Sequence, residues 1–502
     1  ARMGMYKDIL GYIFHLTRKK LKARPVAVLI LLLALAVTLI YDSQVLRVAA
    51  AQAQRMPDLN LKADDRRILV ISPHPDDETL GAGGLMARAR ARGDAVKVVF
   101  ITNGDGFRRG VEKLNGLLPA GASDFMHYGQ VRQQEALTAL GVLGIKPGDV
   151  VFLGYPDGGL ASLWLGYWGQ EKPYRSAYTR QAAVPYSLAF APGQPYTAPS
   201  LLSILEAILQ EYRPTDIYVT DTNDSHPDHW ATGAFTLAAV GILQGADPAF
   251  KPNLYTFVIH NGVWQMLPAL KRDEPLLPPG FFLARGTPWY KLPLAPADLE
   301  RKKRAVAAYR TQELVMPTFL ANFERPNEVF CHLPDQQVTR LAAGTGPDSG
   351  DAAWPEAARV AFDPAGDQIT RKLERGGDLK AFYLVQAGDA TYLRLDTWGR
   401  AGFPVSYTTS IYLLPAHRGE QVRRFSWVVA AGEKQVRWLA RPADFNPPAI
   451  RVNYREHGIE MTLPGLVPPG DHRLMFAAAT TLGKIPLDRI PWHLLQVNGG
   501  DQ

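Results

Sequence analysis

Between residues 67 and 221, short continuous apolar runs alternate with longer amphipathic stretches. The short runs are typical of buried strands and read RILVIS (67–72), AVKVVFITN (95–103), DVVFLG (149–154) and TDIYVTD (215–221). The stretches between them carry apolar residues at helical spacing and close on glycine or proline, at 78–93, 129–144 and 200–214. This alternation predicts an α/β domain, residues 67–335, built on a Rossmann-like, doubly wound and mostly parallel sheet.

A different pattern begins near residue 371. Short alternating runs separated by turn residues, such as 381–387, 391–398 and 409–416, predict a C-terminal β-sandwich-like accessory domain over 371–502. The Ala-, Gly- and Pro-rich segment 336–370 is expected to be a linker. Trp398, Trp427 and Trp438 suit either the core of this domain or a carbohydrate-binding platform.

The N-terminal segment carries a targeting signal. Residues 25–41 are uncharged and almost wholly apolar, at the short end for a transmembrane helix, and the basic stretch TRKKLKAR precedes them. Positive flanks stay cytoplasmic, so we expect a cytoplasmic tail (1–24), an anchor (25–41), a stalk (42–66) and a periplasmic or extracellular remainder. A cleaved signal peptide is the alternative, because residues 48–54 offer small residues in an A-x-A pattern.

Composition narrows the class further. Of 502 residues, 47% are hydrophobic and 21% charged, which is ordinary globular composition. The net charge of +7 comes partly from the first two dozen residues, and no basic stripe with interleaved aromatics follows, so nucleic-acid binding is not expected. The lone Cys331 excludes an internal disulfide and a cysteine-based zinc site, and suits a buried apolar position.

Two polar clusters follow two of the predicted strands. The first is His74-Pro75-Asp76-Asp77-Glu78, and the second is His226-Pro227-Asp228-His229. Because the carboxyl ends of parallel strands meet at one edge of a sheet, we expect both clusters to converge there. Two histidines and one carboxylate form a common catalytic zinc set, and a spare carboxylate can take a proton from metal-bound water. Each cluster alone has a simpler explanation, as a helix cap or a solvated loop, but their joint occurrence favours a metal site.

The glycine-rich stretch GAGG (81–84) lacks the spacing of a phosphate-binding loop, because Met86 fills the late glycine position. We expect it to serve close packing of a helix on the sheet. The segment 160–200 is rich in Tyr, Trp, Pro and Gly and interrupts the α/β pattern. Such a long insertion suits either stacking on sugars or a lid packed on itself.

Together, PHPDDE (73–78) and SHPDH (225–229) resemble the PIG-L/LmbE-like family of zinc-dependent N-acetylglucosaminyl de-N-acetylases, over roughly residues 67–330. The resemblance implies that His74, Asp77 and His229 bind zinc, that Asp76 is the general base, and that Asp228 supports a ligand. It also implies that His226 stabilises the oxyanion and protonates the amine. Arg132 and Asp157 are implied to contact sugar hydroxyls. Nitrogen and oxygen ligands alone do not exclude other divalent metals.

We therefore expect a membrane-anchored, zinc-dependent deacetylase that removes the N-acetyl group from an N-acetylhexosamine and releases acetate. Its substrate is expected to be an extracytoplasmic glycan or glycolipid, such as an exopolysaccharide or an envelope glycan. Two alternatives stay open. One is a non-catalytic, metal-containing glycan-binding protein, and the other is a small-molecule amide hydrolase of the same fold.

Overall fold

The structure is a computed structural model, and it describes residues 56–498 except for 62–64, 117, 170, 263, 265–272, 345, 348–353, 367–373, 417–419, 448–449, 451 and 469. The predicted cytoplasmic tail, the anchor at 25–41 and much of the stalk lie outside the described residues. Among the residues that are described, no helix combines the length and the hydrophobicity needed to cross a bilayer.

A seven-stranded sheet forms the first domain, with the strand order β3-β2-β1-β4-β5-β7-β6. Strands β1 to β5 pair in parallel, and β7 and β6 add an antiparallel edge. The mostly parallel α/β sheet that the sequence predicts is therefore present. The strand bounds are β1 Arg67–Ser72, β2 Ala95–Thr102, β3 Val150–Tyr155, β4 Asp216–Thr220, β5 Asn253–Phe257, β6 Trp289–Pro293 and β7 Asn327–Leu333.

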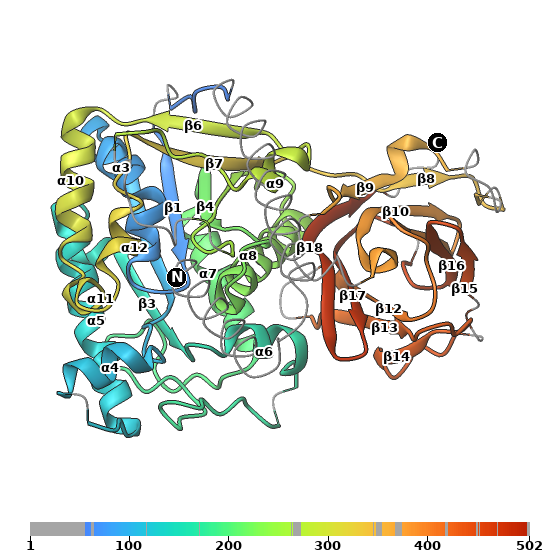
Figure 1. Cartoon of the computed structure of the whole chain (residues 1–502), viewed down its shortest axis with the longest axis horizontal. Coiled ribbons are helices and arrows are strands. Elements are labelled where there is room, and N and C mark those ends of the chain that lie inside the picture. Colours follow the sequence, from blue (N-terminus) through green and yellow to red (C-terminus); the bar gives the residue numbers. More distant parts are fainter. Residues whose placement is uncertain are drawn as a thin grey trace, which may run out of the picture.

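Helices cover both faces of this sheet (Figure 1). In β1, Leu69 and Ile71 join one apolar core while Ile68 and Val70 join the other, as expected for a strand buried on both faces. The first core is covered by α6 Leu160–Gly166, α7 Ala198–Tyr212 and α8 Pro227–Ala246. The second is covered by α3 Asp77–Arg92, α5 Ala122–Val142 and α10 Pro296–Val306. Shorter helices lie between these elements, namely α4 Arg108–Leu114, α9 Gly280–Ala284, α11 Arg310–Glu313 and α12 Pro317–Ala321.

The strand order reverses between β1 and β4, which lie side by side at the centre of the sheet. In open α/β sheets, ligands bind beyond the carboxyl ends of the strands at such a switch point. The two predicted polar clusters follow β1 and β4, so the topology brings them to this one position.

Helix α3, which begins at Asp77, is interrupted at Ala82, where the backbone leaves helical geometry (φ −137°, ψ 16°). The amides of Gly84 and Leu85 donate instead to the carboxylate of Glu328 on β7, at 2.7 and 2.8 Å. Glu328 also pairs with Lys302 of α10 at 2.7 Å, and both side chains are fully buried. The break lets the glycine-rich half of the helix approach the sheet closely.

This approach explains the GAGG stretch. A β-carbon on Gly81 would collide with the ring of Phe257, and one on Gly84 would collide with Leu294. The glycines therefore serve close helix packing, which is the role that the sequence predicts for them.

The second domain consists of two β-sheets that face each other across a common apolar core. Phe382 of one sheet stacks on Phe476 of the other, with ring centroids 4.6 Å apart. One sheet contains β8 Thr339–Leu341, β9 Arg359–Phe362, β10 Leu379–Ala387, β11 Ala390–Thr397, β15 Val452–Arg455 and β16 Gly458–Pro464. The other contains β12 Val405–Leu414, β13 Arg423–Val429, β14 Arg437–Ala440, β17 His472–Leu482 and β18 Ile485–Val497.

The predicted linker, residues 336–370, differs from the observed structure. It contributes β8 and β9, which both pair with β10. Their strand-forming sequences are only three and four residues long and lie among Ala, Gly and Pro residues. They form strands because they pair with the longer strand β10. Of the three tryptophans, Trp427 is fully buried in the core and is not available as a binding platform, while Trp398 and Trp438 are half-buried.

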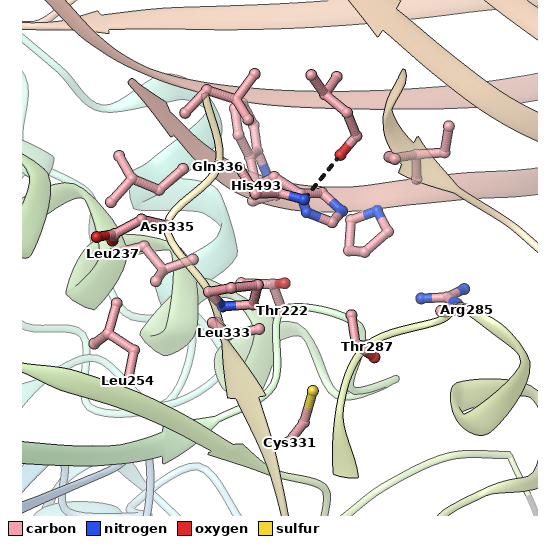
Figure 2. Close-up of a pocket in the computed structure, with 18 of the residues that line it drawn as sticks. Thr222, Leu237, Leu254, Arg285, Thr287, Cys331, Leu333, Asp335, Gln336 and His493 are labelled. Atoms are coloured by element: carbon pink, nitrogen blue, oxygen red, sulfur yellow. Dashed lines mark hydrogen bonds between the residues drawn. The ribbon is translucent and has the colours of Figure 1, made fainter. Parts of the chain in front are cut away.

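The two domains share part of one apolar core, because Tyr412, Met475 and Trp492 of the second domain pack into the core around α8. Trp164 of α6 contacts both Tyr412 and Trp492, with ring centroids 5.3 and 5.2 Å apart. Beside this contact the domains enclose a cavity of about 200 Å³, whose lining includes Thr222, Arg285 and His493 (Figure 2). The second domain is therefore joined to the first over a packed surface.

The buried Lys302–Glu328 pair yields a prediction. Lys302→Met should lower the free energy of unfolding by about 3–5 kcal/mol, because it leaves the Glu328 carboxylate buried without its cation. Chemical denaturation followed by circular dichroism measures this. Lys303→Met on the same helix is the control and should change stability by less than about 0.5 kcal/mol. Equal stabilities for the two variants would contradict the prediction.

Candidate active site

The first loop of the site runs from the end of β1 to the start of α3. Pro73 anchors it, since its carbonyl accepts hydrogen bonds from the amide and the hydroxyl of Thr102 at 3.0 and 2.9 Å. Asp76 caps α3 and has a backbone φ of +133°, a region that residues other than glycine rarely adopt. Glu78 helps to hold it there, because its carboxylate accepts the amide of Asp76 at 3.0 Å.

The second loop runs from β4 to α8. His226 caps this helix, and its Nδ1 accepts the amide of Asp228 at 3.3 Å. Pro227 occupies the first helical position, where its missing N–H costs nothing. His229 follows within the first turn, and its carbonyl accepts the hydroxyl of Thr220 at 2.8 Å. The helix start thus places both histidines at the carboxyl end of β4.

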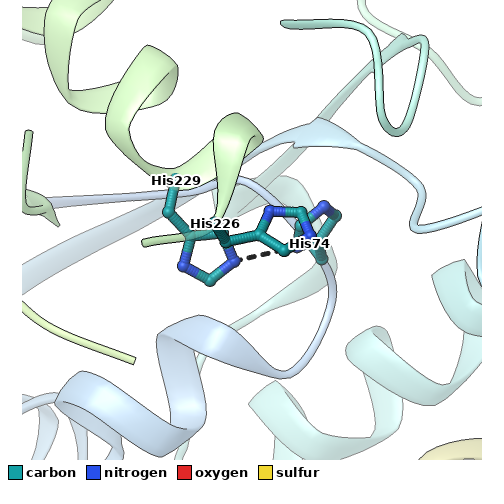
Figure 3. Close-up of side chains that lie close together, drawn as sticks. All are labelled: His74, His226 and His229. Carbon is teal, nitrogen blue, oxygen red and sulfur yellow. Dashed lines mark hydrogen bonds between the residues drawn. The ribbon is translucent and has the colours of Figure 1, made fainter. Parts of the chain in front are cut away.

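The two loops bring His74, Asp77 and His229 together. His74 Nδ1 lies 3.0 Å from Asp77 Oδ2, and His229 Nε2 lies 3.2 Å from both of these atoms. Figure 3 shows the two histidines together with His226. A tetrahedral zinc site with bonds of 2.0–2.1 Å places its ligand atoms about 3.3–3.4 Å apart. The three separations are only a few tenths of an ångström shorter than this, so a small outward movement of the side chains would let the residues hold a metal ion.

Other donor sets overlap this centre. Within the described residues, ligand atoms lie within 4.8 Å of one another in three further sets, namely His74–His226–His229, Asp77–His229–His260 and His74–Asp157–Asp228. Each of these sets includes His74 or His229. The set His74, Asp77 and His229 combines mutual spacings of 3.0–3.2 Å with one negative charge, so these residues could hold the metal ion.

The surrounding charges favour a cation at this centre. Burial alone would lower the pKa of His229, but the carboxylates of Asp77 and Asp224 raise it to about 9. Burial alone would raise the pKa of Asp77, but His229 and His74 hold it well below its usual value. A field that stabilises an imidazolium at this point also stabilises a metal ion.

Asp76 is the neighbouring carboxylate that does not belong to the metal-binding set. It is 4% exposed and pairs with the guanidinium of Arg132, with Oδ1 and Nη2 separated by 3.2 Å. Burial raises the pKa of Asp76 to about 8, against the lowering effect of Arg132. Arg132 is also buried and donates to the carbonyls of Pro75 and Gly104, so it fixes the loop as well as the carboxylate.

His226 lies beside the ligands without belonging to the assigned set. Its ring centroid is 5.0 Å from that of His74 and 4.7 Å from that of His229. Burial, together with the neighbouring histidines, holds its pKa far below the usual value, so the ring is neutral. Because Nδ1 accepts the amide of Asp228, the proton of the neutral ring resides on Nε2.

Asp228 and Asp157 support His74 from its far side. His74 Nε2 lies 3.3 Å from Asp228 Oδ2 and 3.1 Å from Asp157 Oδ1. Asp228 is fully buried and also accepts the amides of Gly158 and Leu160, at 2.6 and 3.0 Å. Carboxylates in this position orient a ligand histidine and fix its tautomer.

The structure thus brings all eight predicted site residues to one place. Arg132 and Asp157 were predicted to contact sugar hydroxyls, and that role stays a prediction. Their observed partners are Asp76 and His74, respectively.

Two further residues at the site were not predicted from the sequence. Asp224 Oδ2 lies 3.3 Å from His229 Nδ1, so Asp224 orients this ligand. His260, which follows β5, stacks on Phe319 and lies 4.9 Å from the ring of His229. Asp224 sits two positions before His226, and His260 ends an apolar run, as His74 nearly does. These positions were signals that sequence analysis could have used.

The aromatic segment 160–200 borders the site on the side of Asp157. A β-carbon on Gly106 would lie 2.7 Å from the ring of Tyr178, and one on Gly159 would lie 2.7 Å from Tyr174. Both tyrosines are half-buried. Other aromatics of the segment, Trp164, Tyr186 and Tyr196, are buried in the core. The largest aromatic side chains of the predicted insertion are therefore packed in the core, while Tyr174 and Tyr178 lie beside the site.

A His–Asp–His set with a spare carboxylate at the switch point of an α/β sheet is typical of metal-dependent hydrolases. The family model described as PIG-L, GlcNAc-PI de-N-acetylase, matches residues 69–240. A Kribbella flavida protein named 1D-myo-inositol 2-acetamido-2-deoxy-alpha-D-glucopyranoside deacetylase is 31% identical over 312 residues, which cover 57% of this chain and 95% of that relative. The chain belongs to the PIG-L family of de-N-acetylases.

Some other relatives match over shorter stretches. A Saccharopolyspora erythraea protein, numbered deacetylase 1 under the same name, is 35% identical over 179 residues, or 34% of this chain. The match spans 53% of that relative, and 59% and 64% of those from Geodermatophilus obscurus and Streptomyces avermitilis.

Solved structures also show similarity at low sequence identity. A deacetylase of the teicoplanin biosynthesis pathway is 17% identical, with a TM-score of 0.35, and covers 53% of this chain and 97% of its own. The N,N'-diacetylchitobiose deacetylase of Pyrococcus horikoshii is 18% identical, with a TM-score of 0.33, and covers 54% and 85%.

Asp224 provides a test of the ligand geometry. Asp224→Asn should weaken the affinity for Zn²⁺ about 10–100-fold, because residues that orient a ligand histidine affect metal binding by this amount. Competition with a chromophoric chelator measures the affinity. Asp389→Asn, at an exposed turn, is the control and should bind zinc as the unmodified protein does. Unchanged affinity in Asp224→Asn would show that His229 needs no such support.

Proposed function

We propose that the protein is a metal-dependent de-N-acetylase that hydrolyses the acetamido group of an N-acetylhexosamine and releases acetate and a free amine. The observation that carries this proposal is the mutual spacing of 3.0–3.2 Å among the ligand atoms of His74, Asp77 and His229, with the carboxylate of Asp76 left beside them. Membership of the PIG-L family supports the same reaction.

His74, Asp77 and His229 would hold the metal ion. When bound, a zinc ion polarises a carbonyl group and lowers the pKa of water to about 7. The positive charge of a bound ion would lower the pKa of Asp76 and so favour the ionised carboxylate that a general base requires.

Asp76 acts as the general base. Its carboxylate accepts a proton from the attacking water, whose oxygen bonds to the acetyl carbon. Arg132 keeps this carboxylate in place through the ion pair at 3.2 Å.

His226 stabilises the negative charge that develops on the substrate. Its Nε2–H donates a hydrogen bond to the oxyanion that develops on the acetyl oxygen, which is the kind of stabilisation that often dominates acyl transfer. The C–N bond then breaks, the nitrogen takes from Asp76 the proton that this carboxylate accepted from water, and acetate leaves.

For the substrate we propose an extracytoplasmic glycan or glycolipid. The support is the apolar segment 25–41 with its basic flank, which favours a membrane-anchored catalytic domain in the periplasm or outside the cell. A second candidate is a small N-acetylglucosaminyl glycoside, because relatives are named as deacetylases of an inositol glycoside.

The base assignment can be tested directly. Asp76→Asn should retain Zn²⁺ but lower turnover about 10²–10⁴-fold, the range that general acid–base catalysis contributes. Acetate release together with metal analysis of the purified variant checks both parts. Asp389→Asn serves again as the control, and full turnover in Asp76→Asn would require another base.

His226 makes a separate prediction. His226→Ala should lower kcat about 10²–10³-fold, because it removes a hydrogen bond that forms mainly in the transition state. KM and the zinc content should stay near those of the unmodified protein. A variant that loses zinc instead would identify His226 as a metal ligand.

The substrate class is tested by acetate release from a panel of N-acetylated polysaccharides, glycolipids and small N-acetylglucosaminyl glycosides. A strong chelator should abolish release from the true substrate, and added Zn²⁺ or Co²⁺ should restore it. Release from the small glycosides alone would favour the second candidate. Glycan binding without acetate release, even after metal addition, would favour a non-catalytic glycan-binding protein.

A further inference from the structure

The helix that carries the metal ligand His229 lies against the second domain. Strands β17 and β18 contact α8, which is buried along most of its length (Figure 1). A β-carbon on Gly241 would lie 2.6 Å from Leu414 and 2.8 Å from Leu494, so the glycine permits this close approach. The C-terminal domain therefore packs on the element that positions the metal site.

One side chain of this domain reaches the second loop of the site. Arg489 lies on β18 and is half-buried, and its Nη2 donates to the backbone carbonyl of Asp224 at 2.6 Å. The two residues are 265 positions apart in the chain. Asp224 is fully buried.

Asp224 connects this contact to both histidines of the loop. Its carboxylate accepts the amides of His226, Ile259 and His260 at 2.9 Å each, and it faces Nδ1 of His229 at 3.3 Å. The orientation of this one residue therefore sets the position of a metal ligand and of the neighbouring His226. A donor that fixes its carbonyl also fixes the peptide plane from which the rest of the loop continues.

We propose that Arg489 is a positioning residue of the active site, and that the C-terminal β-domain thereby contributes to the geometry of the metal site. Arg489 holds the Asp224 carbonyl, Asp224 holds His229, and the metal affinity depends on this chain of contacts. The proposal rests on the metal centre of the proposed function but not on the identity of its substrate.

A second arginine offers a matched control. Arg424 on β13 also crosses between the domains, and its Nη1 donates to the carbonyl of Leu165 in α6 at 3.3 Å. The structure records no contact between Arg424 and the described residues of the two metal-site loops. Loss of Arg424 removes an interdomain hydrogen bond, together with cation–π contacts to Trp168 and Tyr412, without touching the site.

The experiment compares Arg489→Met, Arg489→Lys and Arg424→Met in the full chain. Zn²⁺ affinity is measured by chelator competition, ligand geometry by the visible absorption spectrum of the Co²⁺-loaded protein, and stability by thermal unfolding. Arg489→Met should bind Zn²⁺ about tenfold more weakly and show an altered Co²⁺ spectrum. Arg489→Lys should recover part of the affinity, because its ammonium group can still donate.

The outcomes separate a positioning role from general adhesion between the domains. If Arg489→Met and Arg424→Met lose similar thermal stability and both keep Zn²⁺ affinity within twofold of the unmodified protein, the proposal is overturned. Should Arg489→Met fail to fold, Arg489→Lys carries the test, and an unchanged Co²⁺ spectrum and affinity there would overturn it. These readouts need no substrate, so absence of acetate release would count against the proposed function alone.

Discussion

The close packing of carboxylates and histidines at the centre of the first sheet is the constraint on which the rest of the structure depends. Three ligand atoms of almost fully buried side chains lie 3.0–3.2 Å apart, with the carboxylates of Asp157, Asp224 and Asp228 around the ligand histidines. Buried negative charge on this scale is stable only with compensating positive charge or hydrogen bonds. The backbone amides at the loop ends and the helix start of α8 supply part of this compensation, and a metal ion would supply the remainder.

Much of this arrangement could be predicted from the sequence, because its determinants are local. The apolar runs of β1 and β4 reveal two buried strands, and the polar residues after them mark one sheet edge. The two polar clusters could therefore be grouped before the fold was known, and the choice of His74, Asp77 and His229 as ligands came from the family resemblance. The contacts of Arg132 and Asp157 were beyond this reasoning, because a sequence does not show which way a buried guanidinium or carboxylate turns.

Elements that form only through tertiary contacts could not be predicted from the sequence. Strands β8 and β9 are too short to show a period, and they exist because β10 offers them a partner. Arg489 sits in an ordinary strand, and nothing in its neighbourhood connects it with a residue 265 positions away. Likewise, Glu328 on the distant strand β7 accepts the free amides at the break in α3, so no local sequence pattern predicts the break or this contact.

The backbone of Asp76 has a consequence for how such a protein changes over time. A φ of +133° at a non-glycine residue stores conformational strain, about 1–3 kcal/mol for such positions. Glycine would relieve that strain while deleting the carboxylate. Selection for folding alone would thus favour glycine at this position, whereas the role of general base proposed for Asp76 would favour retention of the aspartate.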